Sequence, residues 1–158
     1  MKQRNIKNGN KNDHWETPQY IFDYLNKKHF KGKDFFDPCP LHAKFDGLSI
    51  NWKQNNFINP PYNGKDKEEF IKKAYYESQK GKKCILLIPA NTDTKIFHKF
   101  IIKGKVEFIK GRVKFKGYNT KGEYVTNKTG QTGSMIVIFE KGQKPSMKAI
   151  NLDKYKGE

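Results

Sequence analysis

The residues best suited to chemistry are the four consecutive residues Asn59-Pro60-Pro61-Tyr62, which follow a short apolar run ending at Ile58. Two prolines in succession cannot donate hydrogen bonds to a sheet and hold φ at about −65°, so a strand ending at Ile58 must turn out rigidly. Asn59 offers an amide oxygen, the Pro60 carbonyl a second acceptor, and Tyr62 a flat aromatic face. Two acceptors beside an aromatic surface suit a planar exocyclic amine, such as that of adenine, held ready to attack an electrophile.

The same four residues also fit an ordinary proline turn after a core strand. The predicted elements around them are needed to distinguish a functional turn from a structural one. Apolar residues at helical spacing predict a helix with Thr17 as N-cap and Pro18 as its first residue, extending to about residue 28. Further helices are predicted over residues 67–80 and from Thr92 or Asp93 to residue 104. Apolar or alternating runs predict strands over residues 33–40, 56–58, 82–90, 106–115 and 134–139, and residues 47–52 predict a short strand or extended turn.

The alternation of strands and helices predicts an α/β fold with a mostly parallel sheet that helices cover on both faces. The last two predicted strands are expected to form an antiparallel hairpin, joined by the long loop from Gly117 to Gly133. Three strands end in a polar group or a proline turn, at Asp37, Asn59 and Asn91. Because open α/β sheets bind ligands at the carboxyl ends of their strands, we expect the site at this edge.

Length and composition indicate one folded domain with basic segments at both ends. Residues 1–12 predict a mobile basic arm, residues 13–142 a single folded domain, and residues 143–158 a basic tail or one poorly fixed helix. The 158 residues include 32 Lys and Arg against 16 Asp and Glu, a formal net charge of +16. A charge this large on so short a chain indicates a polyanionic partner, such as nucleic acid.

The sequence predicts neither a membrane span nor a metal site. No apolar run approaches the about 18 residues of a transmembrane helix, and the N-terminus is polar, so we expect a cytoplasmic protein. Cys39 and Cys84 are far apart, and we expect both to be reduced. Cys39 and His42 have the spacing of metal ligands, but no second pair completes a zinc set.

The tetrapeptide Asn59-Pro60-Pro61-Tyr62 resembles the catalytic motif of S-adenosylmethionine-dependent amino methyltransferases, which methylate adenine in DNA. Segments on both sides resemble, in the same order, other motifs of the small phage-type DNA adenine methyltransferases, the Dam-like family. These segments are residues 15–18, 36–39, 46–52, 87–93 and 111–115. The resemblance extends from about residue 15 to residue 139, and the joint order of the segments makes it specific.

The resemblance implies a compact Rossmann-like methyltransferase fold with S-adenosylmethionine as cofactor. The cofactor-binding residues that it implies are Trp15, Thr17, Pro18, Asp37, Pro38, Cys39 and Asp46. The first three correspond to an opening motif near the methionine end of the cofactor. Asp37 begins a shortened cofactor motif, because residues 40–44 contain no glycine where larger methyltransferases have a glycine-rich turn. Asp46 is the candidate for binding the ribose of the cofactor. It is equally well explained as a turn residue before Gly47.

Basic residues after the third helix predict a surface for DNA. Arg112, Lys114 and Lys116 alternate with apolar residues, so they should face outward from a strand and contact phosphates. The expected DNA-binding residues are Arg112, Lys114, Lys116, Lys121 and Lys128. The loop from Gly117 to Gly133 is the longest candidate for reading the DNA sequence, although its polar residues Asn119, Thr120, Asn127 and Gln131 could equally be a solvated hairpin end.

The sequence therefore predicts a site-specific methyltransferase acting on the N6 amine of adenine in double-stranded DNA, inside a bacterial host if the protein is phage-encoded. Asn59 and the Pro60 carbonyl would hold the amine, Pro61 would make the turn rigid, and Tyr62 would stack on the flipped base. Alternatives are a methyltransferase acting on RNA or on a protein glutamine amide, and a catalytically inactive DNA-binding protein of the same fold. The net charge argues against a protein substrate, but it does not argue against RNA.

Overall fold

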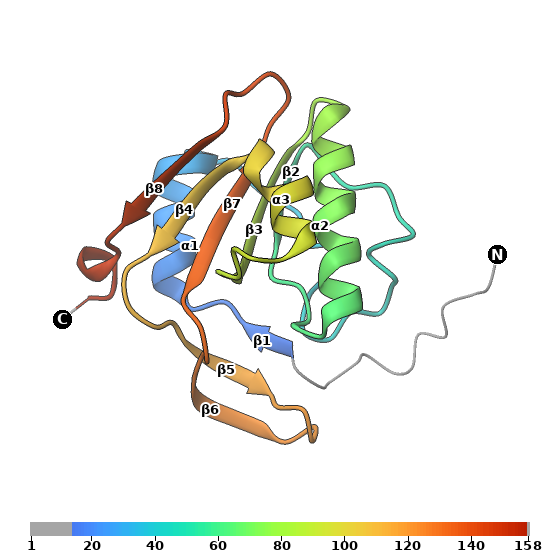
Figure 1. The fold of residues 1–158 in the computed structure, drawn as a ribbon. Coiled ribbons are helices and arrows are strands. Elements are labelled where there is room, and N and C mark those ends of the chain that lie inside the picture. Colours follow the sequence, from blue (N-terminus) through green and yellow to red (C-terminus); the bar gives the residue numbers. More distant parts are fainter. Residues whose placement is uncertain (1–13, 158) are drawn as a thin grey trace.

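The computed structural model describes residues 14–157, so the basic arm expected at residues 1–12 lies outside the described residues. The described chain forms a five-stranded sheet, a three-stranded sheet and three α-helices (Figure 1). The strands are β1 (His14–Glu16), β2 (Asn55–Ile58), β3 (Lys83–Pro89), β4 (Lys105–Ile109), β5 (Lys114–Tyr118), β6 (Tyr124–Thr129), β7 (Ser134–Phe139) and β8 (Ser146–Ile150). The α-helices are α1 (Gln19–Leu25), α2 (Gly64–Gln79) and α3 (Lys95–Lys99), and a π-helical turn, Asn26–Phe30, continues α1.

The larger sheet has the strand order β2-β3-β7-β4-β8 and is mixed, not mostly parallel as the sequence predicted. The pairs β2/β3 and β4/β8 are parallel, whereas β7 is antiparallel to both of its neighbours, β3 and β4. The reason lies in where β7 begins. Its first residue, Ser134, pairs with Pro89 at the carboxyl end of β3, so β7 can only run back towards the opposite edge.

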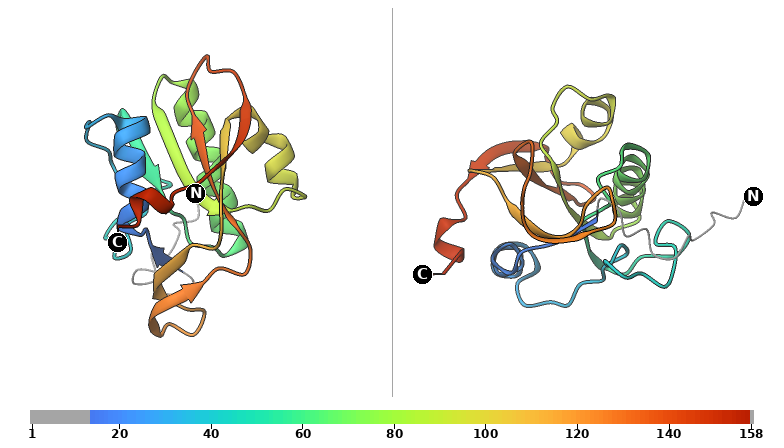
Figure 2. Two further views of the ribbon diagram at one scale, coloured as in Figure 1. Left: turned by 90° about the vertical axis from the view of Figure 1, so that its left-hand side faces the viewer. Right: turned by 90° about the horizontal axis from the view of Figure 1, so that it is seen from below.

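Helices cover both faces of this sheet, which gives the α/β class that the alternating pattern predicted (Figure 2). Strand β3 is apolar along most of its length because both of its faces are buried. Cys84, Leu86 and Ile88 pack in the core with α2 and α3, and the intervening Ile85 and Leu87 pack in the core with α1. Successive side chains of a strand point to opposite faces, so a strand between two helical layers needs apolar residues at every position.

The smaller sheet, β1-β5-β6, projects from the carboxyl edge of the larger one (Figure 1). The sequence predicted one strand over residues 106–115, but Gly111 has a φ of 76° and separates β4 from β5. Strands β4 and β7 do pair antiparallel, as expected. They do not form a hairpin, because the segment between them contributes β5 and β6 to the smaller sheet and is not one long loop.

Two helices begin slightly later than the sequence predicted. The N-cap of α1 is Pro18, and no side chain caps this helix; the Thr17 hydroxyl accepts a hydrogen bond from Asn59 instead. The N-cap of α3 is Thr94, whose hydroxyl accepts from the Phe97 N–H, not Thr92 or Asp93. Each start is shifted by only one or two residues.

The segment predicted as a strand over residues 33–40 is extended only around Phe36, which pairs in parallel with Asn56 of β2. Pro38 and Pro40 have no N–H to donate, so a longer ladder cannot form. Residues 47–52 form turns and no strand. The single bridge is nevertheless enough to place Asp37 beside the end of β2.

The C-terminal segment, expected as a tail or a poorly fixed helix, contributes β8 at the edge of the larger sheet, parallel to β4. Beyond β8, Leu152 is buried, and the Tyr155 ring packs edge-on against Tyr24 of α1 with ring centroids 5.4 Å apart. The side chains of β8 are mostly exposed, because one side of this edge strand is open. The pattern of apolar and polar residues in β8 is therefore too weak for a strand to be predicted from the sequence.

Candidate active site at the carboxyl edge of the sheet

The predicted strand ends meet at one edge of the larger sheet. Strand β2 pairs in parallel with β3 on one side and with Phe36 on the other, so the three chain segments end in the same direction. Asp37, Asn59 and Asn91 follow these ends. The smaller sheet lies beside this edge (Figure 1).

The side chain of Asn59 is held in place by two hydrogen bonds. Its side-chain nitrogen Nδ2 donates to the Trp15 carbonyl oxygen at 2.7 Å and to the Thr17 hydroxyl at 3.2 Å. A backbone carbonyl can only accept, so Nδ2 must be the atom that faces Trp15. The side chain is only 5% exposed, and its oxygen Oδ1 is buried without a hydrogen-bond partner among residues 14–157.

A buried acceptor without a donor costs about 1–3 kcal/mol relative to one that is paired, so few such atoms occur in folded proteins. The two bonds to Nδ2 hold the amide so that Oδ1 is kept available. An N–H group of a ligand would satisfy it. The sequence analysis proposed this acceptor, but it did not identify Trp15 and Thr17 as the residues that orient it.

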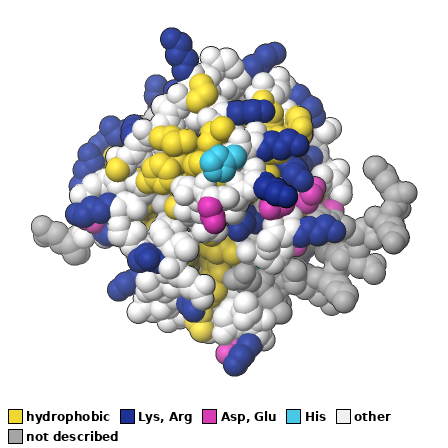
Figure 3. All heavy atoms as spheres, viewed as in Figure 1, with side chains coloured by type: hydrophobic (Ala, Val, Ile, Leu, Met, Phe, Trp, Pro, Cys, Tyr) yellow, Lys and Arg dark blue, Asp and Glu magenta, His cyan; other side chains and the backbone are white. Residues whose placement is uncertain are grey.

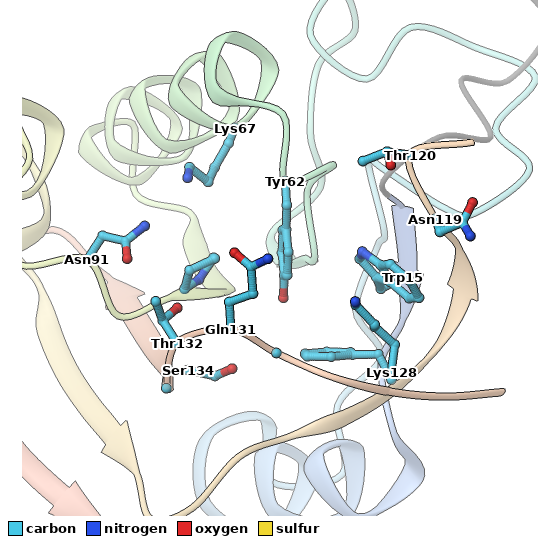
Figure 4. A pocket seen from close by; sticks show the side chains of 14 residues that line it. Trp15, Tyr62, Lys67, Asn91, Asn119, Thr120, Lys128, Gln131, Thr132 and Ser134 are labelled. Atoms are coloured by element: carbon cyan, nitrogen blue, oxygen red, sulfur yellow. The ribbon is translucent and has the colours of Figure 1, made fainter. Parts of the chain in front are cut away.

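Tyr62 lines a pocket of about 400 Å³ between the larger sheet and the smaller one (Figure 4). Its ring meets Phe115 of β5 edge-on, with centroids 5.9 Å apart and an interplanar angle of 89°. Pro60 and Pro61 are buried, as a rigid turn requires, and Tyr62 is half-buried. The two prolines therefore hold the loop that places Tyr62 on the wall of this pocket.

The chemical character of this pocket is polar and cationic. Three carboxamides line it, from Asn91, Asn119 and Gln131, together with the amines of Lys67 and Lys128. Its described lining contains no Asp or Glu. A ligand with hydrogen-bonding edges and a negative charge, such as a nucleotide, fits this lining.

Trp15 belongs to both parts of the site. Its carbonyl oxygen holds Asn59, and its side chain lines the same pocket as Tyr62. The family resemblance implied a position near the cofactor, and the structure adds a position on the wall of the Tyr62 pocket. Gly117 of β5 makes this possible, because a Cβ there would lie 2.8 Å from the Trp15 Cα.

Asp37 is half-buried at the neighbouring strand end, and its carboxyl group is largely shielded from solvent. Burial raises its pKa from 3.8 to about 6, and a hydrogen bond from the Cys39 N–H at 2.8 Å offsets part of this rise. No Lys or Arg forms an ion pair with it within residues 14–157. A buried carboxyl group without a cation is suited to a cationic ligand.

The two neighbours of Asp37 that the resemblance implied are buried beside it. Pro38 and Cys39 are both buried, and the Cys39 sulfur lies 3.8 Å from His14 Nε2. Burial raises the pKa of the Cys39 thiol well above its usual range, so the thiol stays protonated at neutral pH. Both cysteines are free, as expected.

Asp46 is committed to a local turn. Its carboxylate accepts from the Leu48 N–H at 3.0 Å and from the Ser49 hydroxyl at 2.7 Å, which is the turn arrangement considered as one of its two explanations. Its assignment to the cofactor ribose remains a proposal.

The sequence analysis missed the contribution of Gly47. A Cβ at this position would lie 1.8 Å from the Pro38 carbonyl oxygen, and the Gly47 carbonyl accepts from the Trp52 indole at 2.7 Å. Only glycine allows this loop to pack on the turn after Asp37. In the sequence alone, the pair Asp46-Gly47 indicates only a turn.

The predicted DNA-binding residues divide into two groups. Lys128 lines the Tyr62 pocket, whereas Lys114 and Lys116 are exposed on β5 while Val113 and Phe115 are buried, so the predicted alternation is confirmed. Arg112 donates to the Gly130 carbonyl at 3.0 Å and so ties β5 to the segment after β6. Lys121 is exposed at the hairpin turn. Lys and Arg side chains are also widespread on the face shown in Figure 3.

Two further features bear on the class of protein. Among the described residues, no group of three or more His, Cys, Asp or Glu side chains is arranged to hold a metal ion. Within residues 14–157 there is also no helix with the length and apolar character of a membrane span.

Comparison with known proteins agrees with this site. The model of the family described as DNA N-6-adenine-methyltransferase (Dam) matches residues 4–157, nearly the whole chain. Neither the comparison with curated proteins nor that with solved structures gives a match. The segments that suggested the family from the sequence lie within the matched range. The Asn-Pro-Pro-Tyr turn lies at the carboxyl edge of the larger sheet. The protein belongs to the DNA N-6-adenine-methyltransferase (Dam) family.

Proposed function

We propose that the protein transfers a methyl group from S-adenosylmethionine to the N6 amine of adenine in double-stranded DNA, within a Rossmann-like methyltransferase fold. The observation that carries this proposal is the buried Oδ1 of Asn59, oriented by Trp15 and Thr17 and without a donor among residues 14–157. Asn59 lies three residues before Tyr62 in the chain, and Tyr62 lines a pocket that is large enough for a nucleobase. An exocyclic amine entering this pocket would supply the missing donor.

The residues around Asp37 fit S-adenosylmethionine. This cofactor supplies an electrophilic methyl group on a cationic sulfonium, and it also carries a cationic amine. The Asp37 carboxylate, largely shielded from solvent and without a cation among the described residues, would offset that charge. Trp15, Thr17, Pro18, Pro38 and Cys39 surround the same strand ends, and Asp46 is the candidate for the ribose.

The proposed chemistry depends on positioning and electrostatics. The Asn59 oxygen and the Pro60 carbonyl accept the two N–H groups of the adenine amine, and Tyr62 stacks on the ring. As the amine nitrogen forms its bond to the methyl carbon, the bond from that carbon to the sulfonium sulfur would break, with its electron pair left on sulfur as the neutral thioether S-adenosylhomocysteine. Positive charge would grow on the amine nitrogen, and the two acceptors would stabilise it. The amine then loses one proton to solvent. Flipping the adenine out of the duplex costs a few kcal/mol, which stacking on Tyr62 and the cationic pocket would offset.

The lining of the pocket also bears on the alternative substrates. Lys67 and Lys128 line the pocket, and its described lining contains no acidic residue. This favours a nucleotide over the neutral amide of a protein glutamine. RNA would present the same base and phosphate. The orientation of Asn59 favours an active enzyme over an inactive DNA-binding protein, because a protein without catalysis gains nothing from a buried acceptor left without a donor.

The test is to incubate the protein with S-adenosylmethionine carrying a labelled methyl group and with duplex DNA. Mass spectrometry of the digested nucleosides should find the label in N6-methyldeoxyadenosine. Parallel reactions contain RNA of the same sequence and a glutamine-containing peptide. Label only in RNA or only in peptide would overturn the choice of substrate. Absence of any label, together with no cofactor binding by calorimetry, would favour the inactive DNA-binding protein.

DNA affinity is expected to fall steeply with salt, because each phosphate neutralised by a Lys or Arg adds about 0.9 to the slope of log affinity against log salt. Replacing both Lys114 and Lys116 with glutamine should lower this slope by up to about 2. The control replaces Lys141 and Lys144, in the turn between β7 and β8 at the opposite end of the sheet (Figure 1). Equal slopes for the two double variants would show that β5 does not contact the phosphates.

A further inference from the structure

The three carboxamides in the Tyr62 pocket differ in whether they are free to bind a ligand. Asn119 is committed to its own turn, since its oxygen accepts from the N–H groups of Lys121 and Glu123 at 2.9 and 3.0 Å. Its nitrogen donates to the Glu123 carboxylate at 3.1 Å. The side chains of Asn91 and Gln131 make no hydrogen bond within residues 14–157. Only these two amides are available to a base.

Of the two, Gln131 is the one that points towards the stacking surface. It lies in the turn between β6 and β7, and its side chain extends into the pocket towards the Tyr62 ring (Figure 4). Gly130 precedes it and Gly133 follows two residues later, so the backbone of this turn presents little bulk to a base. Gln131 is exposed to solvent.

The acceptors around Asn59 cannot by themselves select adenine. Cytosine also carries an exocyclic amine beside a ring nitrogen, and it could donate to the same two oxygens. Adenine differs on the other side of its amine, where N7 is an acceptor and cytosine has a carbon. Glutamine is well suited to this edge, because its amide nitrogen donates to N7. Discrimination therefore requires one donor, and the pocket contains an uncommitted one.

We propose that Gln131 determines specificity for adenine by donating a hydrogen bond from its side-chain nitrogen to N7 of the flipped base. This inference rests on the proposed function, since it assigns a residue to the base that the site methylates. The amine remains with Asn59 and Pro60, Tyr62 stacks on the ring, and Gln131 reads the remaining edge. The β6–β7 turn thus recognises the target base within the pocket.

The experiment is a double-mutant cycle between the protein and the base. Duplexes carry adenine, 7-deazaadenine or 1-deazaadenine at the methylated position, and kcat/KM is measured for the wild type and for Gln131→Met, which keeps the length of the side chain and removes its amide. Removing N7 should lower kcat/KM of the wild type by about tenfold or more. Gln131→Met should lose a similar factor with adenine and show little further loss with 7-deazaadenine. Removing N1 should affect both proteins equally.

The control variant is Gln79→Met at the C-terminal end of α2, an exposed glutamine far from the pocket. It should respond to the modified bases as the wild type does. Thermal unfolding of Gln131→Met should match that of the wild type, because the side chain is exposed. The cycle also cancels any effect of the deaza substitution on the reactivity of the amine, which is common to both proteins.

Two results would overturn the assignment of Gln131: losses from Gln131→Met and from 7-deazaadenine that simply multiply, or a coupling to N1 instead of N7. In both cases the wild type still methylates adenine, so the proposed function stands. Failure of the wild type to methylate any adenine duplex is a different outcome, and it would refute the proposed function together with this inference.

Discussion

Asn59→Ala is expected to lower kcat for adenine methylation by about 10²-fold or more, the loss seen when an enzyme is deprived of one oriented group that stabilises the transition state. The reason is that Oδ1 is held in place by two hydrogen bonds to Nδ2, so it needs no reorganisation when positive charge grows on the amine. Steady-state methylation of a duplex at saturating cofactor measures this loss. A kcat within a few-fold of the wild type would contradict the mechanism.

This substitution also affects the fold, because the Trp15 carbonyl loses its donor, at a cost of about 1–3 kcal/mol of stability. The matched control is Asn56→Ala in β2, the strand that Asn59 follows. Asn56 is fully buried and donates to the carbonyls of Lys53 and Lys83 at 2.8 and 3.3 Å, so its loss destabilises the fold without touching the site. At a temperature where both variants remain folded, Asn56→Ala should keep its activity. A parallel loss in both variants would mean that stability alone explains the effect.

Thr17→Val is expected to have an intermediate effect, because it removes one of the two bonds to Nδ2 and leaves Oδ1 in place. The bond to the Trp15 carbonyl remains, so the amide is oriented less tightly, and a loss of about tenfold in kcat is reasonable for one hydrogen bond. Unchanged kcat would show that the Trp15 carbonyl alone is enough to orient Asn59.

Asp37→Asn is expected to weaken S-adenosylmethionine binding by about 10- to 100-fold, the range for loss of a hydrogen bond to a charged group. Calorimetry on the free protein measures this directly. Binding to the wild type should also weaken as the pH falls through about 6, because the protonated carboxyl no longer offsets the charge of the ligand. The variant should lack this dependence. A variant that binds as tightly as the wild type would exclude Asp37 from the cofactor site.

The same substitution should stabilise the fold at neutral and alkaline pH. The folded-state pKa of Asp37, about 6, exceeds its ordinary value of 3.8, so the folded protein binds the proton more tightly than the unfolded chain. The free energy of unfolding therefore falls as the pH rises from about 4 to about 6, by up to about 3 kcal/mol for this group. Asparagine does not titrate, so Asp37→Asn should be more stable than the wild type by up to this amount at pH 8.

Thermal or denaturant unfolding of both proteins across this pH range tests the sign. The control is Asp93→Asn, in the exposed segment before α3, which should leave the pH dependence unchanged. A variant that is less stable than the wild type at pH 8 would show that a cation not among the described contacts stabilises the Asp37 carboxylate.

Much of the framework followed from local patterns alone. Helical spacing predicted the core face of α2, a continuous apolar run predicted strand β3, and two prolines predicted the rigid turn at Asn59. Each of these patterns depends only on neighbouring residues. The order of short motifs was enough to identify the family. The alternation of charged and apolar residues on β5 was also predictable, because a strand with one buried face dictates it.

The tertiary structure decided which distant groups meet. The Thr17 hydroxyl bonds to Asn59 and not to its own helix, Gly47 packs on Pro38, and β7 inserts between β3 and β4. A local and a distant hydrogen bond each contribute only about 0.5–1.5 kcal/mol, so propensity along the chain cannot choose between them. The choice depends on which surfaces the whole fold brings together. The sequence by itself therefore determined the rigid Asn-Pro-Pro-Tyr turn, and only the tertiary structure determined how the Asn59 amide is oriented.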